Sequence, residues 1–264
     1  MSKLRFMPSL ISFLNLFCGF WALVLIGRGQ FATAAWLIII AAICDGLDGA
    51  VARLVRGASR IGVELDSLVD MVSFGVATSL LLFCGLLQPL GTAGLLIAFI
   101  PLLAGLLRLA RYNVLNAEPA QKKGDFIGLP ITSAALLTAS FYLYMPAAHH
   151  HQADLGVWLA LTGVISLLML SPIPYKPLPG IRVKGSHRHW LSVPAIIAAA
   201  LFVIWNPALA IFPLMILYTL SGPIMWGASQ WRRMRAAEAP DEAARQPVPT
   251  RKRMPHSRRP GRVR

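Results

Sequence analysis

Apolar residues along this chain are gathered into long blocks separated by short polar segments. Each block has roughly 20 residues, the length that crosses a bilayer core of about 30 Å. Backbone polar groups find no water partner in lipid, so each block is expected to form a helix. The pattern predicts eight membrane-spanning helices, at residues 8–27, 31–53, 63–87, 91–113, 130–148, 154–171, 190–206 and 208–227.

The positions of Lys and Arg predict how these helices are oriented, because cytoplasmic loops carry the excess of positive charge. If the N-terminus lies in the cytoplasm and the helices alternate, 24 of the 25 Lys and Arg residues fall on the cytoplasmic side, and only Arg28 falls outside. We therefore expect an all-α integral membrane protein, a bundle of about eight helices in the cell (inner) membrane, with both termini in the cytoplasm.

Composition divides the chain into a membrane domain and a polar tail. Of its 264 residues 56% are hydrophobic and 14% are charged, and the net charge is +14. Residues 1–228 are expected to form the transmembrane domain, and residues 229–264 a basic, disordered cytoplasmic tail. Basic charge beside a final membrane span favours attraction to anionic lipid over nucleic-acid binding. Three cysteines, Cys18, Cys44 and Cys84, lie in apolar runs without metal-site spacing and are expected to be free thiols.

Acidic residues are the most informative polar feature. The first 117 residues contain five of them, all within 26 positions: Asp45, Asp48, Glu64, Asp66 and Asp70. A carboxylate near membrane depth costs a few kcal/mol, so it marks a functional site by default. Asp45 and Asp48 are three residues apart and Asp66 and Asp70 four apart, so each pair shares a helix face. A short loop joins the two helices, and the four aspartates are expected to converge near their cytoplasmic ends.

Four carboxylates at close range repel one another unless cations neutralise them. An all-oxygen site suits Mg²⁺, Mn²⁺ or Ca²⁺ rather than zinc or copper. A site this acidic can hold two ions, the arrangement that clamps both sides of a phosphoryl displacement. Ion pairs of the aspartates with Arg53, Arg56 and Arg60 are the alternative. Small residues beside Asp48, among them Gly46 and Ala50, leave room either for a ligand or for a packed helix.

The residues from Asp45 to Asp70 also form a known pattern. They resemble the signature of the CDP-alcohol phosphatidyltransferases. The matching residues are Asp45-Gly46-Leu47-Asp48-Gly49-Ala50-Val51-Ala52-Arg53, then, after eight residues, Gly62, after three more Asp66, and after another three Asp70. The resemblance implies a six-helix core and transfer of a phosphatidyl group from a CDP-linked lipid to an alcohol, with release of CMP. It implies that Asp45, Asp48, Asp66 and Asp70 bind a divalent metal, Mg²⁺ or Mn²⁺. It also implies that Asp70 is the general base and that Gly49, Arg53 and Ser59 contact the CDP-lipid.

A finer resemblance concerns the acceptor alcohol. The stretches Glu64–Ala77, Arg108–Val114 and Gly128–Pro130 resemble the phosphatidylserine synthase branch, although Thr78 and Thr132 stand where that branch leads us to expect proline. The substrates implied are CDP-diacylglycerol and L-serine. Arg108, Arg111 and Asn113, at the cytoplasmic end of the fourth span, are candidates for binding the acceptor. Arginines there suit glycerol 3-phosphate or inositol phosphate equally, and choline is a further alternative.

A cation transporter is the alternative from another class of protein. Transporters commonly show broken helices in matching halves, and this chain has a single acidic cluster. The sequence leaves the oligomeric state open, a homodimer included.

Overall fold

The computed structural model describes residues 7–55, 60–117, 126–145, 155–175 and 207–238. These residues are almost entirely helical. The chain divides into two compact units, Met1–Trp226 and Gly227–Arg264, which are described separately. The predicted seventh span, residues 190–206, lies outside the described residues, so the number of membrane spans stays a prediction.

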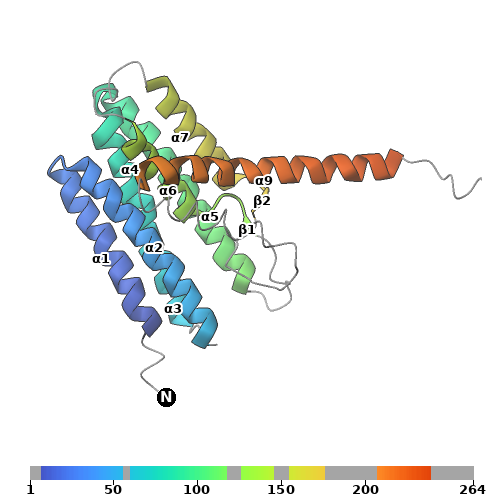
Figure 1. Cartoon of the computed structure of the whole chain (residues 1–264), viewed down its shortest axis with the longest axis horizontal. Coiled ribbons are helices and arrows are strands. Elements are labelled where there is room, and N and C mark those ends of the chain that lie inside the picture. The colour runs from blue at the N-terminus through green and yellow to red at the C-terminus, as the bar shows by residue number, and fades with distance from the viewer. Residues whose placement is uncertain (1–6, 56–59, 118–125, 146–154, 176–206, 239–264) are drawn as a thin grey trace, which may run out of the picture. The chain divides into compact units, whose positions relative to one another are not determined.

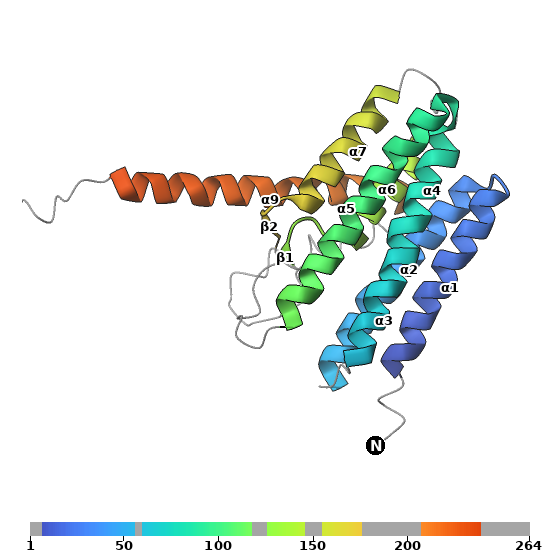
Figure 2. The same cartoon turned by 180° about the vertical axis from the view of Figure 1, so that it is seen from behind.

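The first two helices form an antiparallel hairpin. Helix α1 spans Met7–Gly27 and α2 spans Phe31–Val55, and they lie side by side in both views (Figures 1 and 2). Gly29, with φ of 75°, ends α1. Its amide donates to the carbonyl of Ile26 at 3.0 Å, and the Gln30 amide donates to that of Leu25 at 2.9 Å. This pair of bonds is the Schellman motif, which satisfies the last carbonyls of a helix and turns the chain back.

The third predicted span is a helical run with changes of pitch. It consists of α3 (Arg60–Asp70), a π-helical segment η2 (Met71–Val76), α4 (Ala77–Leu82), a second π-helical segment η3 (Phe83–Leu87) and a 3₁₀ turn η4 (Gln88–Leu90). Segments of π-helix are rare and are frequent at functional sites. The first of them begins directly after Asp70.

Contact between α1 and η2 is close enough to require glycine. A β-carbon at Gly19 would lie 2.7 Å from the α-carbon of Ser73. The Ser73 hydroxyl donates a hydrogen bond to the backbone carbonyl of Asn15 at 3.2 Å. The backbones of these two segments therefore meet without intervening side chains, directly beside Asp70.

Four further helices follow in the described part of the chain. They are α5 (Thr92–Ala117), α6 (Ile131–Tyr144), α7 (Leu155–Leu170) and α9 (Pro207–Glu238). Helix α5 packs on α7, and α6 packs on α2. In the second unit, the Arg235 guanidinium lies 4.1 Å from the centre of the Trp231 ring. Helix α9 continues to Glu238 through residues that favour helix, such as Met234 and Ala236, so the first part of the predicted tail is helical. Disorder beyond Glu238 stays a prediction.

Two short strands, which the sequence analysis did not predict, join the segments before α6 and after α7. Strand β1 (Phe126–Ile127) pairs antiparallel with β2 (Pro174–Tyr175). The buried Tyr175 hydroxyl donates to the backbone carbonyl of Thr219 in α9 at 3.0 Å. Burial, and then repulsion from Tyr218, raises the pKa of Tyr175 to about 12, so the phenol stays protonated and remains a donor at neutral pH.

The described helices have the length and composition of membrane spans. Five are long enough and apolar enough to cross a bilayer, at Leu10–Gly27, Phe31–Gly49, Glu64–Leu90, Thr92–Val114 and Ala210–Arg235, and the shorter helices α6 and α7 are also apolar. Large side chains such as Phe13, Phe17 and Leu96 are exposed, as expected for surfaces that face lipid. The protein is an all-α membrane protein, as predicted, and its three cysteines are free.

Candidate active site

Three of the four predicted metal ligands come together. One carboxylate oxygen each from Asp45, Asp66 and Asp70 lies within 4.8 Å of the other two. Asp45 stands just past the middle of α2, and Asp66 and Asp70 occupy successive turns of α3. Asp70 is buried, while Asp45 and Asp66 are half-buried. The separation of four residues puts Asp66 and Asp70 on one face of α3, and that face meets α2.

Asp48 stands next to this group but is turned toward α1. Its side chain is 7% exposed, and its Oδ2 accepts a hydrogen bond from the Ser12 hydroxyl. Its Oδ1 is buried and has no hydrogen-bond partner among the described residues. Asp48 remains close enough to Asp45 and Asp66 for charge repulsion between the carboxylates. It therefore adds to the negative charge of the site without belonging to the group of three.

Helix α6 contributes a polar group to the same site. The Thr132 hydroxyl donates to Oδ2 of Asp45 at 3.1 Å. Asp45 and Asp48, neighbours on α2, thus each accept a hydroxyl hydrogen bond from a different helix.

Buried polar atoms without partners line the inner side of the site. Arg108 of α5 is 6% exposed, and its charge attracts that of Asp70. Asn15 of α1 lies beside Asp70 without meeting hydrogen-bond geometry. Among the described residues, Arg108 Nε, Asp70 Oδ1 and both polar atoms of the Asn15 side chain have no hydrogen-bond partner. Buried polar groups are nearly always paired, so these atoms indicate a place for a polar ligand.

The other two acceptor candidates, Arg111 and Asn113, have protein partners instead. Asn113 Nδ2 donates to Ser67 Oγ at 3.1 Å and to Glu64 Oε2 at 3.4 Å, which ties α5 to α3. The exposed Arg111 donates from Nη2 to the Ser171 carbonyl at 3.4 Å, just beyond the end of α7. These contacts join helices, whereas Arg108 is buried and its charge attracts that of Asp70.

The predicted donor-lipid residues are described only in part. Gly49 lies half-buried in α2. The side chain of Arg53 and the whole of Ser59 lie outside the described residues. Arg56, the alternative ion-pair partner of the aspartates, also lies outside them. No described atom would come within 4 Å of a β-carbon at Gly46, so helix packing does not explain that glycine within the described structure.

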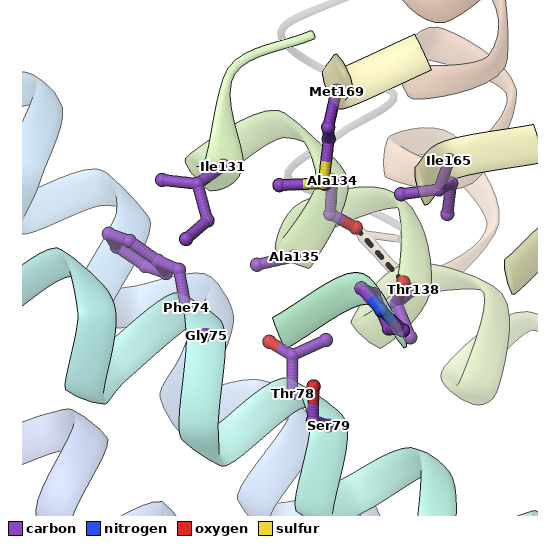
Figure 3. A pocket seen from close by; sticks show the side chains of 11 residues that line it. Phe74, Gly75, Thr78, Ser79, Ile131, Ala134, Ala135, Thr138, Ile165 and Met169 are labelled. Carbon is purple, nitrogen blue, oxygen red and sulfur yellow. Dashed lines mark hydrogen bonds between the residues drawn. The ribbon is translucent and has the colours of Figure 1, made fainter. Parts of the chain in front are cut away.

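A separate small cavity lies deeper in the bundle, beside η2 (Figure 3). Its lining is mainly apolar and contains none of the aspartates. The Thr78 hydroxyl is buried there without a hydrogen-bond partner among the described residues, and the Thr138 hydroxyl bonds to the Ala134 carbonyl of its own helix at 3.0 Å. This cavity is distinct from the carboxylate group.

Comparison with known proteins identifies the family. A family model described as CDP-alcohol phosphatidyltransferase matches residues 5–169, which include every carboxylate above. The chain belongs to the CDP-alcohol phosphatidyltransferase family. A CDP-diacylglycerol–serine O-phosphatidyltransferase of Helicobacter pylori is 32% identical over 226 residues, covering 85% of this chain and 92% of the relative.

Two further relatives in this family point to related reactions. A CDP-diacylglycerol–serine O-phosphatidyltransferase of Mycobacterium tuberculosis is 32% identical over 240 residues, covering 87% of this chain and 81% of the relative. An archaetidylserine synthase of Methanothermobacter thermautotrophicus is 33% identical over 177 residues, covering 66% of this chain and 71% of the relative. The names of all three relatives include serine.

The donor set of this phosphatidyltransferase fits a hard divalent cation. The group of three contains only carboxylates, the ligands that Mg²⁺ and Mn²⁺ prefer. Oδ1 of Asp48 and Oδ1 of Asp70 are buried and have no hydrogen-bond partner in the described part of the chain. Buried, unpaired carboxylate oxygens are costly unless a cation compensates them. Asp45, Asp66 and Asp70 are therefore the residues that could hold the metal, with Asp48 beside them.

Three polar residues at this site were not predicted to act there. Ser12 and Asn15 are three residues apart on α1, within an otherwise apolar run, and polar groups in a membrane span could have drawn attention to them. Thr132 was noted only as a departure from the family pattern. Its contact with Asp45 joins residues 87 positions apart, so no local sequence pattern predicts this contact.

Proposed function

We propose that the protein transfers the phosphatidyl group of CDP-diacylglycerol to L-serine, giving phosphatidylserine and CMP. One observation carries the proposal: three carboxylate oxygens lie within 4.8 Å of one another, inside the region that matches the family. The relatives named as serine transferases, similar over most of this chain, support serine as the acceptor. The acceptors glycerol 3-phosphate, inositol phosphate and choline are the alternatives.

Asp45, Asp66 and Asp70, with Asp48 beside them, would hold Mg²⁺ or Mn²⁺, in a site acidic enough for two ions. Bound there, a divalent cation neutralises the diphosphate of the donor and stabilises CMP as leaving group. Gly49, Arg53 and Ser59 are proposed to contact the CDP-lipid, as the family signature implies. The exposed surroundings of Gly46 favour a lipid donor approaching α2 on that face.

Asp70 is proposed as the general base. The serine hydroxyl oxygen forms a bond to the phosphorus that carries diacylglycerol, the bond from this phosphorus to the CMP oxygen breaks, and the hydroxyl proton passes to the Asp70 carboxylate. The buried position of Asp70 and its unpartnered Oδ1 support this role, because one oxygen remains to accept the proton.

Arg108 is the acceptor-binding residue that the contacts favour. A serine carboxylate needs a cation, and Arg108 is buried, has an unpartnered Nε and attracts the charge of Asp70. Asn15, beside Asp70, offers an amide that can accept from the serine ammonium or donate to its hydroxyl. Arg111 and Asn113 are less suited, since both already bond to other helices.

The distribution of Lys and Arg supports an inner-membrane protein whose active site and termini face the cytoplasm. The basic residues after the last span would then meet anionic lipid at the same surface.

The test is an acceptor comparison with the purified full-length protein. Labelled serine, glycerol 3-phosphate, inositol phosphate and choline are offered separately with CDP-diacylglycerol and Mn²⁺, and CMP and labelled lipid are measured. Serine should give both products in equal amounts. Faster lipid formation with another alcohol would show that this alcohol, and not serine, is the acceptor. Cation flux into vesicles without any CMP release would favour the transporter.

A further inference from the structure

Thr132 joins α6 to the metal-binding face of α2. It stands in the first turn of α6, and its hydroxyl donates to Oδ2 of Asp45 at 3.1 Å. Asp45 is one of the three carboxylates whose oxygens lie within 4.8 Å of one another. The bond therefore acts on a carboxylate of the site, from a helix that supplies none of the carboxylates in the described group.

The segment before α6 is fixed in place by the end of α7. The Gly128 amide donates to the Ile173 carbonyl at 2.9 Å, and the Leu129 amide donates to the Leu168 carbonyl at 3.0 Å. Gly128 has φ of +78°, and a β-carbon there would lie 3.1 Å from the carbonyl carbon of Met169. Leu129 is fully buried. These two backbone hydrogen bonds thus set where α6 begins, and with it the position of the Thr132 hydroxyl.

A hydrogen bond to one oxygen of a carboxylate restricts rotation of the whole group. In metal sites, donors that contact a ligand rather than the metal orient that ligand, and their loss commonly weakens metal binding. We propose that Thr132 is a positioning residue, whose hydroxyl holds the Asp45 carboxylate in the orientation that binds the divalent metal. The inference rests on the proposed function, because it takes Asp45 as a metal ligand.

The same helix provides a matched control. Thr138 is also a threonine of α6, but its hydroxyl bonds to the Ala134 carbonyl one turn earlier, as Figure 3 shows. It lines the apolar cavity, and none of the carboxylates of the site lines that cavity. Thr→Val at either position removes a hydroxyl and keeps the side chain's shape, so a difference between the two variants reports the contact with Asp45.

The experiment measures Mn²⁺ binding to the purified full-length protein, through the electron paramagnetic resonance signal of free Mn²⁺. Thr132→Val should weaken Mn²⁺ binding by about 10-fold or more, in the range found when a metal ligand loses its supporting partner. Thr132→Ser, which keeps the donor, should recover most of the affinity, and Thr138→Val should bind as wild type. The Mn²⁺ concentration for half-maximal phosphatidyl transfer should rise in parallel for Thr132→Val.

Asp45→Asn separates the failure of this inference from the failure of the proposed function. If Asp45→Asn weakens binding while Thr132→Val and Thr138→Val both match wild type, the positioning role is wrong and the metal site stands. If Asp45→Asn also binds Mn²⁺ as wild type, the metal site and the inference fall together. Should Thr132→Val not elute as a folded protein in gel filtration, Thr132→Ala against Thr138→Ala makes the same comparison.

Discussion

The Ser12 hydroxyl of α1 donates a hydrogen bond to Oδ2 of Asp48 in α2, across 36 residues of sequence. Both side chains are buried, and the other carboxylate oxygen of Asp48, Oδ1, has no hydrogen-bond partner among the described residues. The bond fixes one of the motif carboxylates to the neighbouring helix, beside the group formed by Asp45, Asp66 and Asp70.

Ser12→Ala should therefore destabilise the protein. It removes the donor from a buried carboxylate, and hydrogen bonds to charged groups contribute about 1.5–3 kcal/mol. Ser140→Ala is the control, because the buried Ser140 hydroxyl bonds to the Leu137 carbonyl of its own helix. Thermal unfolding in detergent should show a clearly larger loss for Ser12→Ala. Equal losses of thermal stability in the two variants would mean that the bond to Asp48 contributes no more than the bond of Ser140 within its own helix.

Gly19→Ala should separate α1 from η2. The new β-carbon would meet the Ser73 backbone at 2.7 Å, and overpacking of this kind costs about 1–3 kcal/mol. Gly163→Ala in α7 is matched, since no described atom would lie within 4 Å of its β-carbon. That change should leave stability unchanged or raise it slightly, because alanine favours helix. The prediction is wrong if the two variants unfold at the same temperature.

Asp70→Asn should remove turnover while leaving the protein folded and inserted. Asparagine keeps the shape but cannot take the serine proton, and a general base typically contributes about 100-fold to 10,000-fold in rate. The control is Glu64→Gln, an exposed acid of the same helix that bonds to Asn113. Release of CMP is followed under saturating serine. An Asp70→Asn protein that works at a rate near wild type would exclude Asp70 as the base.

Arg108→Gln should raise the KM for serine. Loss of a charge-assisted bond worth about 1.5 kcal/mol or more corresponds to about 10-fold or more in affinity, while the KM for CDP-diacylglycerol should change much less. Arg111→Gln tests the alternative, because Arg111 is exposed and bonds to the Ser171 carbonyl. If Arg111→Gln has the larger effect on the serine KM, the acceptor binds nearer the surface of α5 than proposed.

The hydrophobic pattern was sufficient for the helices. The apolar runs that predict spans at residues 8–27 and 91–113 correspond to α1 and α5 within a few residues. Changes of pitch within a run were not predictable, since nothing in the sequence of η2 marks where the α-helical pitch gives way to a π-helical one. Strands β1 and β2 are only two residues long, too short for any alternation to appear.

The carboxylate group was predictable from spacing, and its details were not. Asp66 and Asp70 are four residues apart and differ by about 40° around the helix, whereas Asp45 and Asp48, three apart, differ by about 60° in the opposite sense. That offset lets Asp45 meet α6 at Thr132 while Asp48 meets α1 at Ser12. Which helix lies on each side is a property of the packed bundle, so a sequence cannot reveal it.

The most direct test of the account is anomalous diffraction from crystals of the protein grown with Mn²⁺. The account predicts a Mn²⁺ peak in contact with carboxylate oxygens of Asp45, Asp66 and Asp70, and loss of that peak in Asp66→Asn crystals. Mn²⁺ peaks elsewhere in the molecule, with none between these three side chains, would contradict it.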